Sequence, residues 1–293
     1  MFIPQLKLIP RSSSVLHKRY SSTMRAFAPI VVAFCFFAAV GDTLKMSMNV
    51  DTLYNVPLSN YGARVRFIIH SKKIEASVNV APPTAIGGLK SPEYLALNLQ
   101  GKMPLLVCSD GMAIPESDTI CRYLLDKFTH GPSFLPGDIK QRVLSEQICR
   151  IHDIYMGPIL GCMYKTPPFS IFATDRGAAL EELKKQLFGI NDLVSNFDKT
   201  YPSLSGNFLC GSEISLADAA LFPTVVFCMY ILPEYFGLEQ SKFLGPRLSN
   251  WFNFMSREVA EARMIRDDME VGLTGWKTSG RWDAITEELK SKK

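Results

Sequence analysis

The sequence predicts a chain of two unlike halves, a mixed α/β half followed by an all-helical half. In the first, short runs that alternate apolar and polar residues are separated by stretches with helical spacing, which is typical of strands interleaved with helices. From Gln141 onward helical periodicity continues almost without interruption. We therefore expect a sheet with helices over residues 50–130, a linker over 131–140, and helices and a tail over 141–293.

The first strand and the first helix are predicted on either side of a short loop. Residues 51–56 alternate as a strand that ends before Pro57, and helical spacing begins at Tyr61. Ser59 and Asn60 stand between the two elements, and both are good N-cap residues. A hydroxyl group is therefore expected at the start of this helix.

A second strand, a short helix and a hairpin follow. The strand is predicted over residues 74–80 and the helix over residues 90–99. An apolar run over residues 105–108 then leads to the turn dipeptide Asp110-Gly111, the strongest short-range hairpin signal. The hairpin predicts an antiparallel strand pair.

Helical spacing resumes after the hairpin at Ile120, Leu124 and Phe128, so a helix is expected to begin near Glu116-Ser117. Ser117 is the predicted N-cap, and the free backbone N–H groups at this end favour an anion. A helix cap with no further role is the alternative interpretation of this acid–hydroxyl pair.

The helical half contains one strong capping signal. Ser215 and Asp218 form a predicted capping box, in which each side chain accepts a hydrogen bond from an exposed N–H group of the other residue. The box would start a core helix over residues 216–230, bent at Pro223. Asp218 is therefore expected to be a folding residue rather than a catalytic acid, and Trp251 a core residue.

The hairpin region carries a family resemblance. Its Gly-Lys-Met-Pro-Leu-Leu, followed by Pro-Glu-Ser-Asp-Thr-Ile, resembles the glutathione-binding half of the cytosolic glutathione S-transferases. The resemblance extends over roughly residues 53–264. It implies a thioredoxin-like β-α-β-α-β-β-α domain followed by an all-helical domain, which is the glutathione transferase fold.

The resemblance also implies which residues bind glutathione as co-substrate. They are Lys90, Lys102, Met103, Pro104, Glu116 and Ser117. In the family the matching proline is cis, the residue before it offers its main chain to the cysteinyl part of glutathione, and the acid–hydroxyl pair holds the γ-glutamyl group. The two lysines would face the glycyl carboxylate. The spacing of Lys90 differs by one residue from the family pattern, and a solvated surface lysine is its alternative interpretation.

Ser59 is the predicted catalytic residue. Plant-type members present a serine five residues before the arginine of an Arg-Val pair, and Ser59 keeps that spacing to Arg64-Val65. A thiol with a pKa of about 8.5 is mostly protonated at neutral pH, so a hydroxyl donor and a helix N-terminus would raise its thiolate fraction. Tyr54 is the rival, because other classes use a tyrosine at the end of the first strand, and Tyr61 is a weaker one. A cap without a catalytic role remains the alternative for Ser59.

The electrophilic substrate would bind between the Ser59 loop and the first helices of the second half. The candidates are aromatic or soft apolar side chains: Tyr155, Met156, Met163, Tyr164, Pro167 and Phe169. Each is also a reasonable core residue, and such generic side chains do not identify the substrate. The role of residues 274–293, which include Trp276 and Trp282, is left open.

Positive charge gathers at the N-terminal end of the chain. The 293 residues carry a formal net charge of +4, and residues 1–41 contain five basic residues and no acid. The remaining chain therefore carries about −1, which argues against a nucleic-acid partner.

Residues 1–45 are expected to be a leader that is cleaved or disordered. Residues 10–23 are rich in Ser and basic residues, as in transit peptides, and the eleven-residue apolar run 30–40 suits a secretory signal and is too short to span a bilayer. Met24 as the true start and an uncleaved membrane anchor are alternatives. We expect an organelle, by a plastid or an endomembrane route, if the leader is used and the cytoplasm otherwise, without stable membrane insertion.

Cysteine and histidine usage argues against a disulfide scaffold and against a histidine metal site. Apart from Cys35 in the leader, the cysteines lie in apolar surroundings without a C-x-x-C pair, as core thiols do, and the four histidines lack metal-ligand spacing. The resulting hypothesis is a homodimeric detoxifying transferase, without a metal, that joins glutathione to apolar electrophiles or reduces hydroperoxides. The alternative is a non-catalytic ligand-binding or protein-docking module of the same fold.

Overall fold

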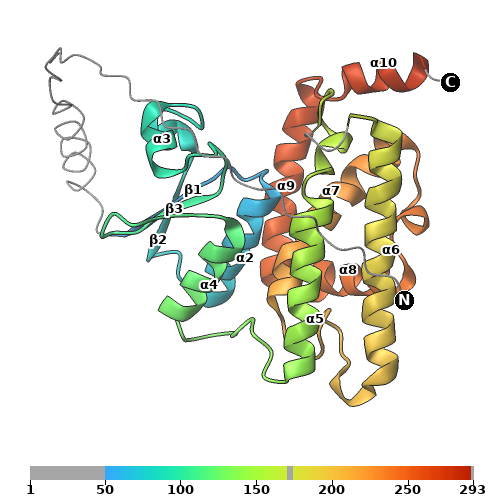
Figure 1. Ribbon diagram of the computed structural model, residues 1–293, viewed down its shortest axis with the longest axis horizontal. Helices are drawn as coiled ribbons and strands as arrows, with labels where there is room; N and C mark the ends of the chain where they lie inside the picture. Colours follow the sequence, from blue (N-terminus) through green and yellow to red (C-terminus); the bar gives the residue numbers. More distant parts are fainter. Residues whose placement is uncertain (1–49, 170–173, 292–293) are drawn as a thin grey trace, which may run out of the picture. The chain divides into compact units, whose positions relative to one another are not determined.

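The computed structural model describes residues 50–169 and 174–291 (Figure 1). The predicted leader, residues 1–45, lies outside the described residues. The first half contains β1 (Asp51–Tyr54), α2 (Asn60–Lys72), β2 (Val78–Ala81), the 3₁₀ turn η1 (Pro83–Ile86), α3 (Pro92–Leu97), β3 (Leu105–Val107), β4 (Ala113–Pro115) and α4 (Ser117–Lys127).

A four-stranded mixed sheet organises this half, with the strand order β2-β1-β3-β4. β1 pairs in parallel with β2, whereas β3 pairs antiparallel with both β1 and β4. In this register Leu53 lies opposite Val80 on one side and Leu106 on the other. The element order is the one that the family resemblance implied, and the thioredoxin-like fold is confirmed.

The two faces of the sheet contact different helices. Leu53 and Leu106 belong to the main core, which also contains the buried faces of α2 and α4. Tyr54 and Leu105 instead form a separate cluster with Tyr94 of α3. Because successive side chains of a strand point to opposite faces, α3 covers the face away from α2 and α4 (Figure 1).

Two predicted strand boundaries were wrong. β1 ends at Tyr54 rather than Val56, since the chain then turns through the loop before α2. β2 begins at Val78 rather than Ile74, because the N–H groups of Ser77 and Val78 both donate to the carbonyl of Ile74. Those hydrogen bonds form a turn after α2, so the apolar residue there packs into the core without extending the strand.

The second half is helical, and its main helices are α5 (Ile139–Arg150), α6 (Arg176–Thr200), α7 (Leu216–Phe236), α8 (Pro246–Glu258), α9 (Ala260–Thr278) and α10 (Asp283–Ser291). Shorter turns are the π-helix η2 (Ile151–Met156) and the 3₁₀ helices η3 (Leu160–Met163), η4 (Pro202–Leu204) and η5 (Gln240–Lys242). α7 packs against α2, α5 and α9. It is long and apolar enough to cross a membrane, but 83% of its most apolar stretch is buried inside the fold, as in the core helix of a soluble protein.

The predicted capping box at the start of α7 is confirmed. The Asp218 carboxylate accepts hydrogen bonds from the N–H and hydroxyl of Ser215, from the Leu209 N–H, and from Nε1 of the fully buried Trp251. Burial raises the pKa of Asp218, although these four donors favour its charged form. The helix runs to Phe236, past the predicted end at residue 230, and contains Pro223 within its length.

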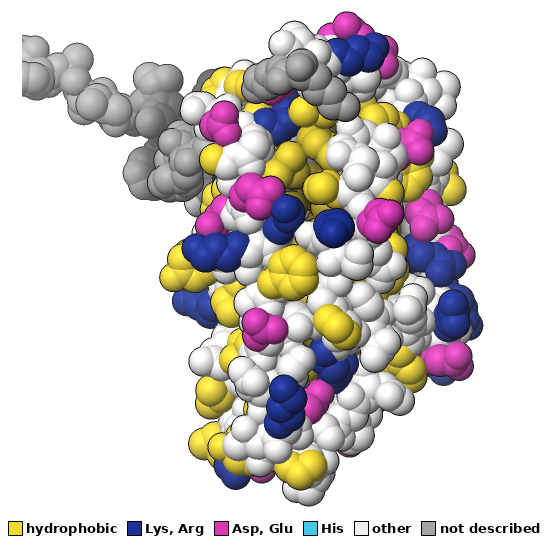
Figure 2. Space-filling view, turned by 90° about the vertical axis from the view of Figure 1, so that its right-hand side faces the viewer, with side chains coloured by type: hydrophobic (Ala, Val, Ile, Leu, Met, Phe, Trp, Pro, Cys, Tyr) yellow, Lys and Arg dark blue, Asp and Glu magenta, His cyan; other side chains and the backbone are white. Residues whose placement is uncertain are grey.

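The C-terminal segment packs onto the helical half. Trp282 is buried, donates from Nε1 to the Met163 carbonyl at 2.9 Å, and stacks on Tyr235 with 4.4 Å between ring centroids. Arg176 at the start of α6 pairs with Glu288 of α10 at 2.8 Å. Figure 2 shows one face of the molecule, on which acidic and basic side chains of the described residues are interspersed rather than gathered by sign.

Candidate functional site

The loop before β3 is held by two side chains on one carbonyl. The Lys102 carbonyl accepts hydrogen bonds from Oη of Tyr94 and from Nδ2 of Asn98, each at 2.8 Å. The Met103–Pro104 peptide bond is cis, as in the family pattern. Within the described residues the N–H and carbonyl of Met103 have no backbone partner. This peptide group is therefore free to pair with the extended backbone of a ligand.

The start of α4 presents a second set of free polar groups. Ser117 is buried, and neither its hydroxyl nor the N–H groups of residues 117–119 are hydrogen-bonded within the described part of the chain. Free N–H groups and the helix dipole favour an anion at this end of the helix. A hydroxyl beside them suits a carboxylate such as the one in a γ-glutamyl group.

The N-cap of α4 is Glu116, and the prediction of Ser117 as the N-cap was wrong. Glu116 has a φ of 71°, which is uncommon for a residue other than glycine. This turn directly follows β4 and makes Ser117 the first helical residue, with its side chain directed inward. Backbone strain of this kind concentrates at ligand sites. The exposed carboxylate of Glu116 makes no capping hydrogen bond.

Ser59 is the N-cap of α2, as predicted. Its Oγ accepts a hydrogen bond from the Gly62 N–H at 3.1 Å, and its own N–H donates to the Val56 carbonyl at 3.0 Å. A hydroxyl has one proton and two lone pairs, so capping uses only a lone pair. The Ser59 proton has no acceptor among the described residues, and the side chain is partly exposed. The cap and a donor role for Ser59 are therefore compatible.

The two rival tyrosines lie in different environments. Tyr54 is buried on the α3 side of the sheet, away from α2, and burial raises its pKa. Tyr61 packs edge-on against the ring of His152, with 5.6 Å between centroids, and burial raises its pKa as well. Ser59 is the candidate donor whose hydroxyl stands at a helix N-terminus.

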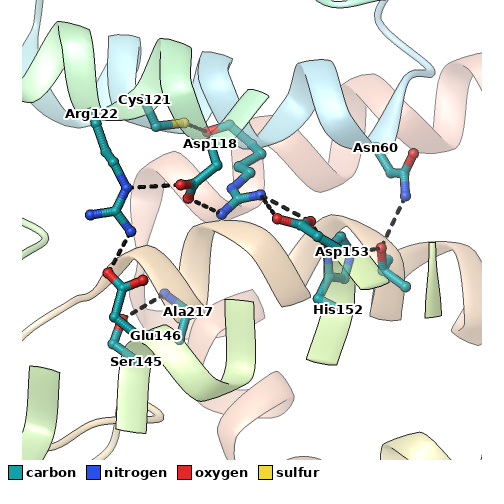
Figure 3. Close-up of polar contacts among 11 residues, drawn as sticks. Asn60, Asp118, Cys121, Arg122, Ser145, Glu146, His152, Asp153 and Ala217 are labelled. Carbon is teal, nitrogen blue, oxygen red and sulfur yellow. Dashed lines mark hydrogen bonds and ion pairs between the residues drawn. The ribbon is translucent and has the colours of Figure 1, made fainter. Parts of the chain in front are cut away.

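A charge network that the sequence analysis missed connects α2, α4 and η2 (Figure 3). Its centre is Arg64, whose side chain is 0% exposed and lies 2.6 Å from Asp118 of α4 and 3.0 Å from Asp153 of η2. Burial opposes the Arg64 charge, but Asp153 and Asp118 favour it, so its pKa lies above the ordinary value. Burial also opposes the charge of Asp153, yet the hydrogen bond from His152 and the charge of Arg64 lower its pKa to about 2.

One signal in the sequence pointed to this network. Arg64 lies within an apolar helix face, and an arginine that is buried on such a face requires carboxylate partners. The family pattern used Arg64 only for its spacing to Ser59. In the sequence Asp118 stands out only as a member of the Pro-Glu-Ser-Asp-Thr-Ile motif. Asp153 on η2 is 89 residues away from Arg64 in the sequence, and no local pattern connects the two.

The network continues to the outer side of α4. Arg122 lies 2.8 Å from Asp118 and also contacts Glu146 of α5. A cavity of about 220 Å³ lies at this position, lined by Asp118, Arg122, Glu146, Cys149, Arg150 and Asp153. Because several of its charged groups already pair with one another, this cavity is unlike the apolar pocket that an electrophile requires.

The predicted electrophile residues are not brought together at one surface. Tyr155 is exposed, whereas Met156 is fully buried and belongs to the core rather than to an accessible wall. Tyr164 is partly buried and lies against Trp276 of α9 and Phe227 of α7, with 5.2 and 5.7 Å between centroids. Of the other candidates, Met163 and Phe169 are buried and Pro167 is exposed.

The Tyr164 aromatic group is connected to the Ser59 loop through α9. A Cβ on Gly272 would lie 3.0 Å from the Leu58 side chain, so this helix packs directly on the loop. Trp276 follows one helical turn later, on the same side of α9. The aromatic group formed by Tyr164, Phe227 and Trp276 thus lies along the helix that contacts the Ser59 loop.

The two predicted glycyl-binding lysines are exposed and make no ion pair among the described residues. The Lys90 ammonium is 3.0 Å from where a Gly101 Cβ would stand, which places it beside the loop of Lys102 and Met103. The described cysteines are all buried free thiols. Within the described residues, no three His, Cys, Asp or Glu side chains are grouped as metal ligands.

Comparisons with known proteins match both halves of the chain. Residues 53–132 match the family model described as Glutathione S-transferase, N-terminal domain, and residues 177–253 match Glutathione S-transferase, C-terminal domain. The chain is 33% identical to glutathione S-transferase F10 of Arabidopsis thaliana, over 59% of this chain and 78% of that protein. It is 28% identical to glutathione S-transferase 1 of Dianthus caryophyllus, over 65% of this chain and 81% of that protein.

Solved structures show the same fold. Ure2p in complex with glutathione aligns with a TM-score of 0.59 at 17% identity, covering 74% of this chain and 99% of that one. Glutathione transferase F2 from Populus trichocarpa aligns with a TM-score of 0.55 at 19% identity, covering 75% and 99%. At these identities the likeness concerns the fold alone.

Proposed function

Because the chain belongs to the glutathione S-transferase family, we propose that it activates glutathione as a thiolate and transfers it to an apolar electrophile or uses it to reduce an organic hydroperoxide. The observation that carries this proposal is that the Ser59 hydroxyl at the N-terminus of α2 has a proton with no acceptor among the described residues. A serine that only capped the helix would use a lone pair of its hydroxyl oxygen and would not need the hydroxyl proton.

Glutathione would bind through the free polar groups of the first half. Its cysteinyl backbone pairs with the Met103 peptide, and its γ-glutamyl carboxylate takes the Ser117 hydroxyl and the free N–H groups of α4. The exposed Glu116 carboxylate suits the γ-glutamyl ammonium, and the exposed Lys90 and Lys102 suit the glycyl carboxylate. These contacts use groups that have no partner among the described residues.

The thiol would then lie near Ser59. Donation of the Ser59 proton to the sulfur, together with the positive end of α2, stabilises the thiolate relative to the thiol. Each unit by which the thiol pKa falls corresponds to about 1.4 kcal/mol. The thiolate attacks the electrophilic carbon and displaces its leaving group. Alternatively, it attacks the outer oxygen of a hydroperoxide, so that an S–O bond forms as the O–O bond breaks and the alkoxide takes up a proton and leaves as the alcohol. The glutathione sulfenic acid formed in this way reacts with a second glutathione to give the disulfide and water.

The electrophile would lie against the aromatic group formed by Tyr164, Phe227 and Trp276. This group has accessible aromatic surface, because Tyr164 and Trp276 are only partly buried. Trp276 is also contacted by the Arg281 guanidinium, 4.8 Å from its ring centroid. Such surfaces suit planar apolar substrates.

The experiment that tests this function combines retention on immobilised glutathione with the Ser59→Ala variant and a chloronitrobenzene substrate. We expect the protein to be retained, and Ser59→Ala to lower kcat by about tenfold to a hundredfold while glutathione binding changes little. Asp138→Ala, which removes the N-cap of α5, is the control for lost capping and should keep its activity. A chain that binds no glutathione is a non-catalytic module, and full activity without Ser59 would assign the chemistry to Tyr54.

Two further expectations belong to the same proposal. We propose that the chain forms a homodimer through the neighbourhood of α4, where the adjoining α5 exposes apolar side chains. We also propose that residues 1–45 direct the protein to an organelle and are removed there. Sequencing the mature N-terminus of the native protein tests the second expectation, since a protein that retains residues 1–45 in the cytoplasm contradicts it.

A further inference from the structure

A threonine in the core helix α7 connects three separate elements. Thr224 is fully buried, and its Oγ1 lies 3.0 Å from Nδ2 of Asn60 in α2 and 2.8 Å from Nε2 of His152 in η2. His152 is itself buried, with Nδ1 2.8 Å from the Asp153 carboxylate. Figure 3 shows Asn60 and His152 at the end of the charge network away from Arg122.

The direction of these hydrogen bonds follows from the number of available protons. The Asn60 amide nitrogen can only donate, so the Thr224 oxygen accepts there and sends its single proton to His152. Nε2 of His152 is then an acceptor, and the ring proton lies on Nδ1, where it is donated to Asp153. A neutral ring satisfies every member of this chain, whereas a second ring proton would leave the Thr224 hydroxyl proton without an acceptor among the described residues.

The two ends of the chain lie beside the two parts of the candidate site. At one end Asn60 follows Ser59 directly and is the first residue of α2. At the other end Asp153 accepts from Arg64, which also pairs with Asp118, the residue after Ser117. The helical half therefore contacts both the first turn that would hold the thiol and the first turn that would hold the γ-glutamyl group.

The loop before Ser59 is held by contacts that do not involve Thr224, so the hydrogen bond from Asn60 to Thr224 acts on the first turn of α2. Arg66 donates to the Pro57 carbonyl at 2.5 Å and pairs with Asp268 of α9. Apart from the backbone hydrogen bonds of the helix, the first turn of α2 makes two hydrogen bonds, one from the Gly62 N–H to Ser59 and one from the Asn60 side chain to Thr224. A small displacement of that turn would move the Ser59 hydroxyl away from the sulfur.

We propose that the Asn60–Thr224–His152 chain positions the first turn of α2, and with it the Ser59 hydroxyl, for thiol activation. Thr224 is thus a positioning residue that lies in the other half of the fold from the group it serves. This inference rests on the proposed function of Ser59. The inference adds to the proposed function that the helical half sets the geometry of thiol activation as well as covering the site.

The first test measures the turn directly, without glutathione. Thr224→Val keeps the shape of the side chain but removes both hydrogen bonds, and Thr224→Ser keeps them. Ser145→Ala removes a buried hydroxyl whose contacts, with Ala217 and Cys210, lie inside the helical half. In hydrogen-exchange mass spectrometry of the full chain, we expect Thr224→Val to speed exchange of the Gly62 and Ala63 amides about five- to tenfold. Thr224→Ser and Ser145→Ala should match the wild type. Unchanged exchange in Thr224→Val overturns the proposal.

The second test measures thiol activation. We expect Thr224→Val to lower kcat about tenfold and to raise the thiol pKa of bound glutathione by about one unit, as read from thiolate absorbance against pH. KM for glutathione should stay within about twofold, and Thr224→Ser should restore both values. Lower thermal stability with unchanged kcat and thiol titration would show a purely structural role and overturn the proposal. If the wild type binds no glutathione, the proposed function fails, and faster exchange in Thr224→Val would then show a structural tie alone, which also overturns the positioning role.

Discussion

The carboxylate of Asp118, the second residue of α4, lies 2.6 Å from the buried guanidinium of Arg64 in α2. This ion pair joins the helix predicted to hold the γ-glutamyl group to the helix that is capped by Ser59. Arg64 also pairs with Asp153 in the helical half, so one side chain connects three elements. The stability of the candidate site therefore depends on a residue that need not touch either substrate.

Arg64→Met should be strongly destabilising. It removes the charge that offsets Asp118 and Asp153, and breaking a buried pair by removing one partner costs about 3–5 kcal/mol. Arg64→Lys keeps the charge but not the forked geometry, so an intermediate loss is expected. Urea unfolding followed by tryptophan fluorescence measures both changes, and the exposed Arg142→Met on α5 is the control. A loss below about 1 kcal/mol for Arg64→Met would contradict the central role of this side chain.

Asp153 should make the free energy of unfolding depend on pH in the acid range. Its pKa of about 2 in the fold is below the ordinary 3.8, so its contribution to the free energy of unfolding is fully present above about pH 4 and is lost as the pH falls through 2. The contribution is of the order of 2 kcal/mol. The stability difference between the wild type and Asp153→Asn should therefore shrink between pH 5 and about pH 2.

The control for this pH series is Asp126→Asn, which removes an exposed carboxylate of α4 that has no ion pair among the described residues. Unfolding would be followed by urea titration at each pH for all three proteins. A stability difference between the wild type and Asp153→Asn that stays constant from pH 5 to pH 2 is the result that would contradict the assignment.

Gly62 and Asn55 should be coupled. A Cβ on Gly62 would lie 1.7 Å from Oδ1 of Asn55, whose amide is buried without a hydrogen-bond partner. Gly62→Ala should therefore cost about 1–3 kcal/mol, whereas Asn55→Ala should be nearly neutral because it removes an unpartnered polar group. In the double variant the clash is gone, so most of the loss should be recovered, and a double-mutant cycle of urea midpoints measures the coupling. Additive losses would show that the close approach does not limit Gly62.

The proposed dimer should depend on an exposed apolar strip of α5. Ile139 and Val143 lie one turn apart and are 66% and 54% exposed. Light scattering should give about twice the 32.8 kDa chain mass for the wild type, or twice that of the processed chain if the leader is removed. Ile139→Glu with Val143→Glu should give the monomer mass, because charges cannot be buried there without partners. Val271→Glu, at a 75% exposed position on α9, is the control and should stay dimeric. A monomeric wild type would contradict the proposal.

Local patterns predicted most of the fold because the interactions that make each element are local. The Ser215–Asp218 capping box, the Ser59 N-cap and the Asp110-Gly111 hairpin are each contained within a few residues. The boundaries of β1 and β2 were harder, since each is set by the turn beside the strand, the loop before α2 for β1 and the Ile74–Val78 turn for β2, rather than by the apolar run itself. The N-cap of α4 was misplaced by one residue for the same reason, because the end of β4 sets the turn at Glu116.

The sequence by itself determined the glutathione transferase fold through its family motifs, and it supplied the groups that we propose to bind glutathione and activate its thiol, because each of them lies in a short motif with its own chemistry. Only the tertiary structure decided which groups are free and which are paired. Arg64, His152 and Thr224 are unremarkable in sequence, and their roles come from being buried together, where every proton must find an acceptor and every charge a partner. The start of α4 changed in the same way, from a predicted Ser117 cap to a Glu116 turn that leaves the Ser117 hydroxyl and the first N–H groups of the helix open to a ligand.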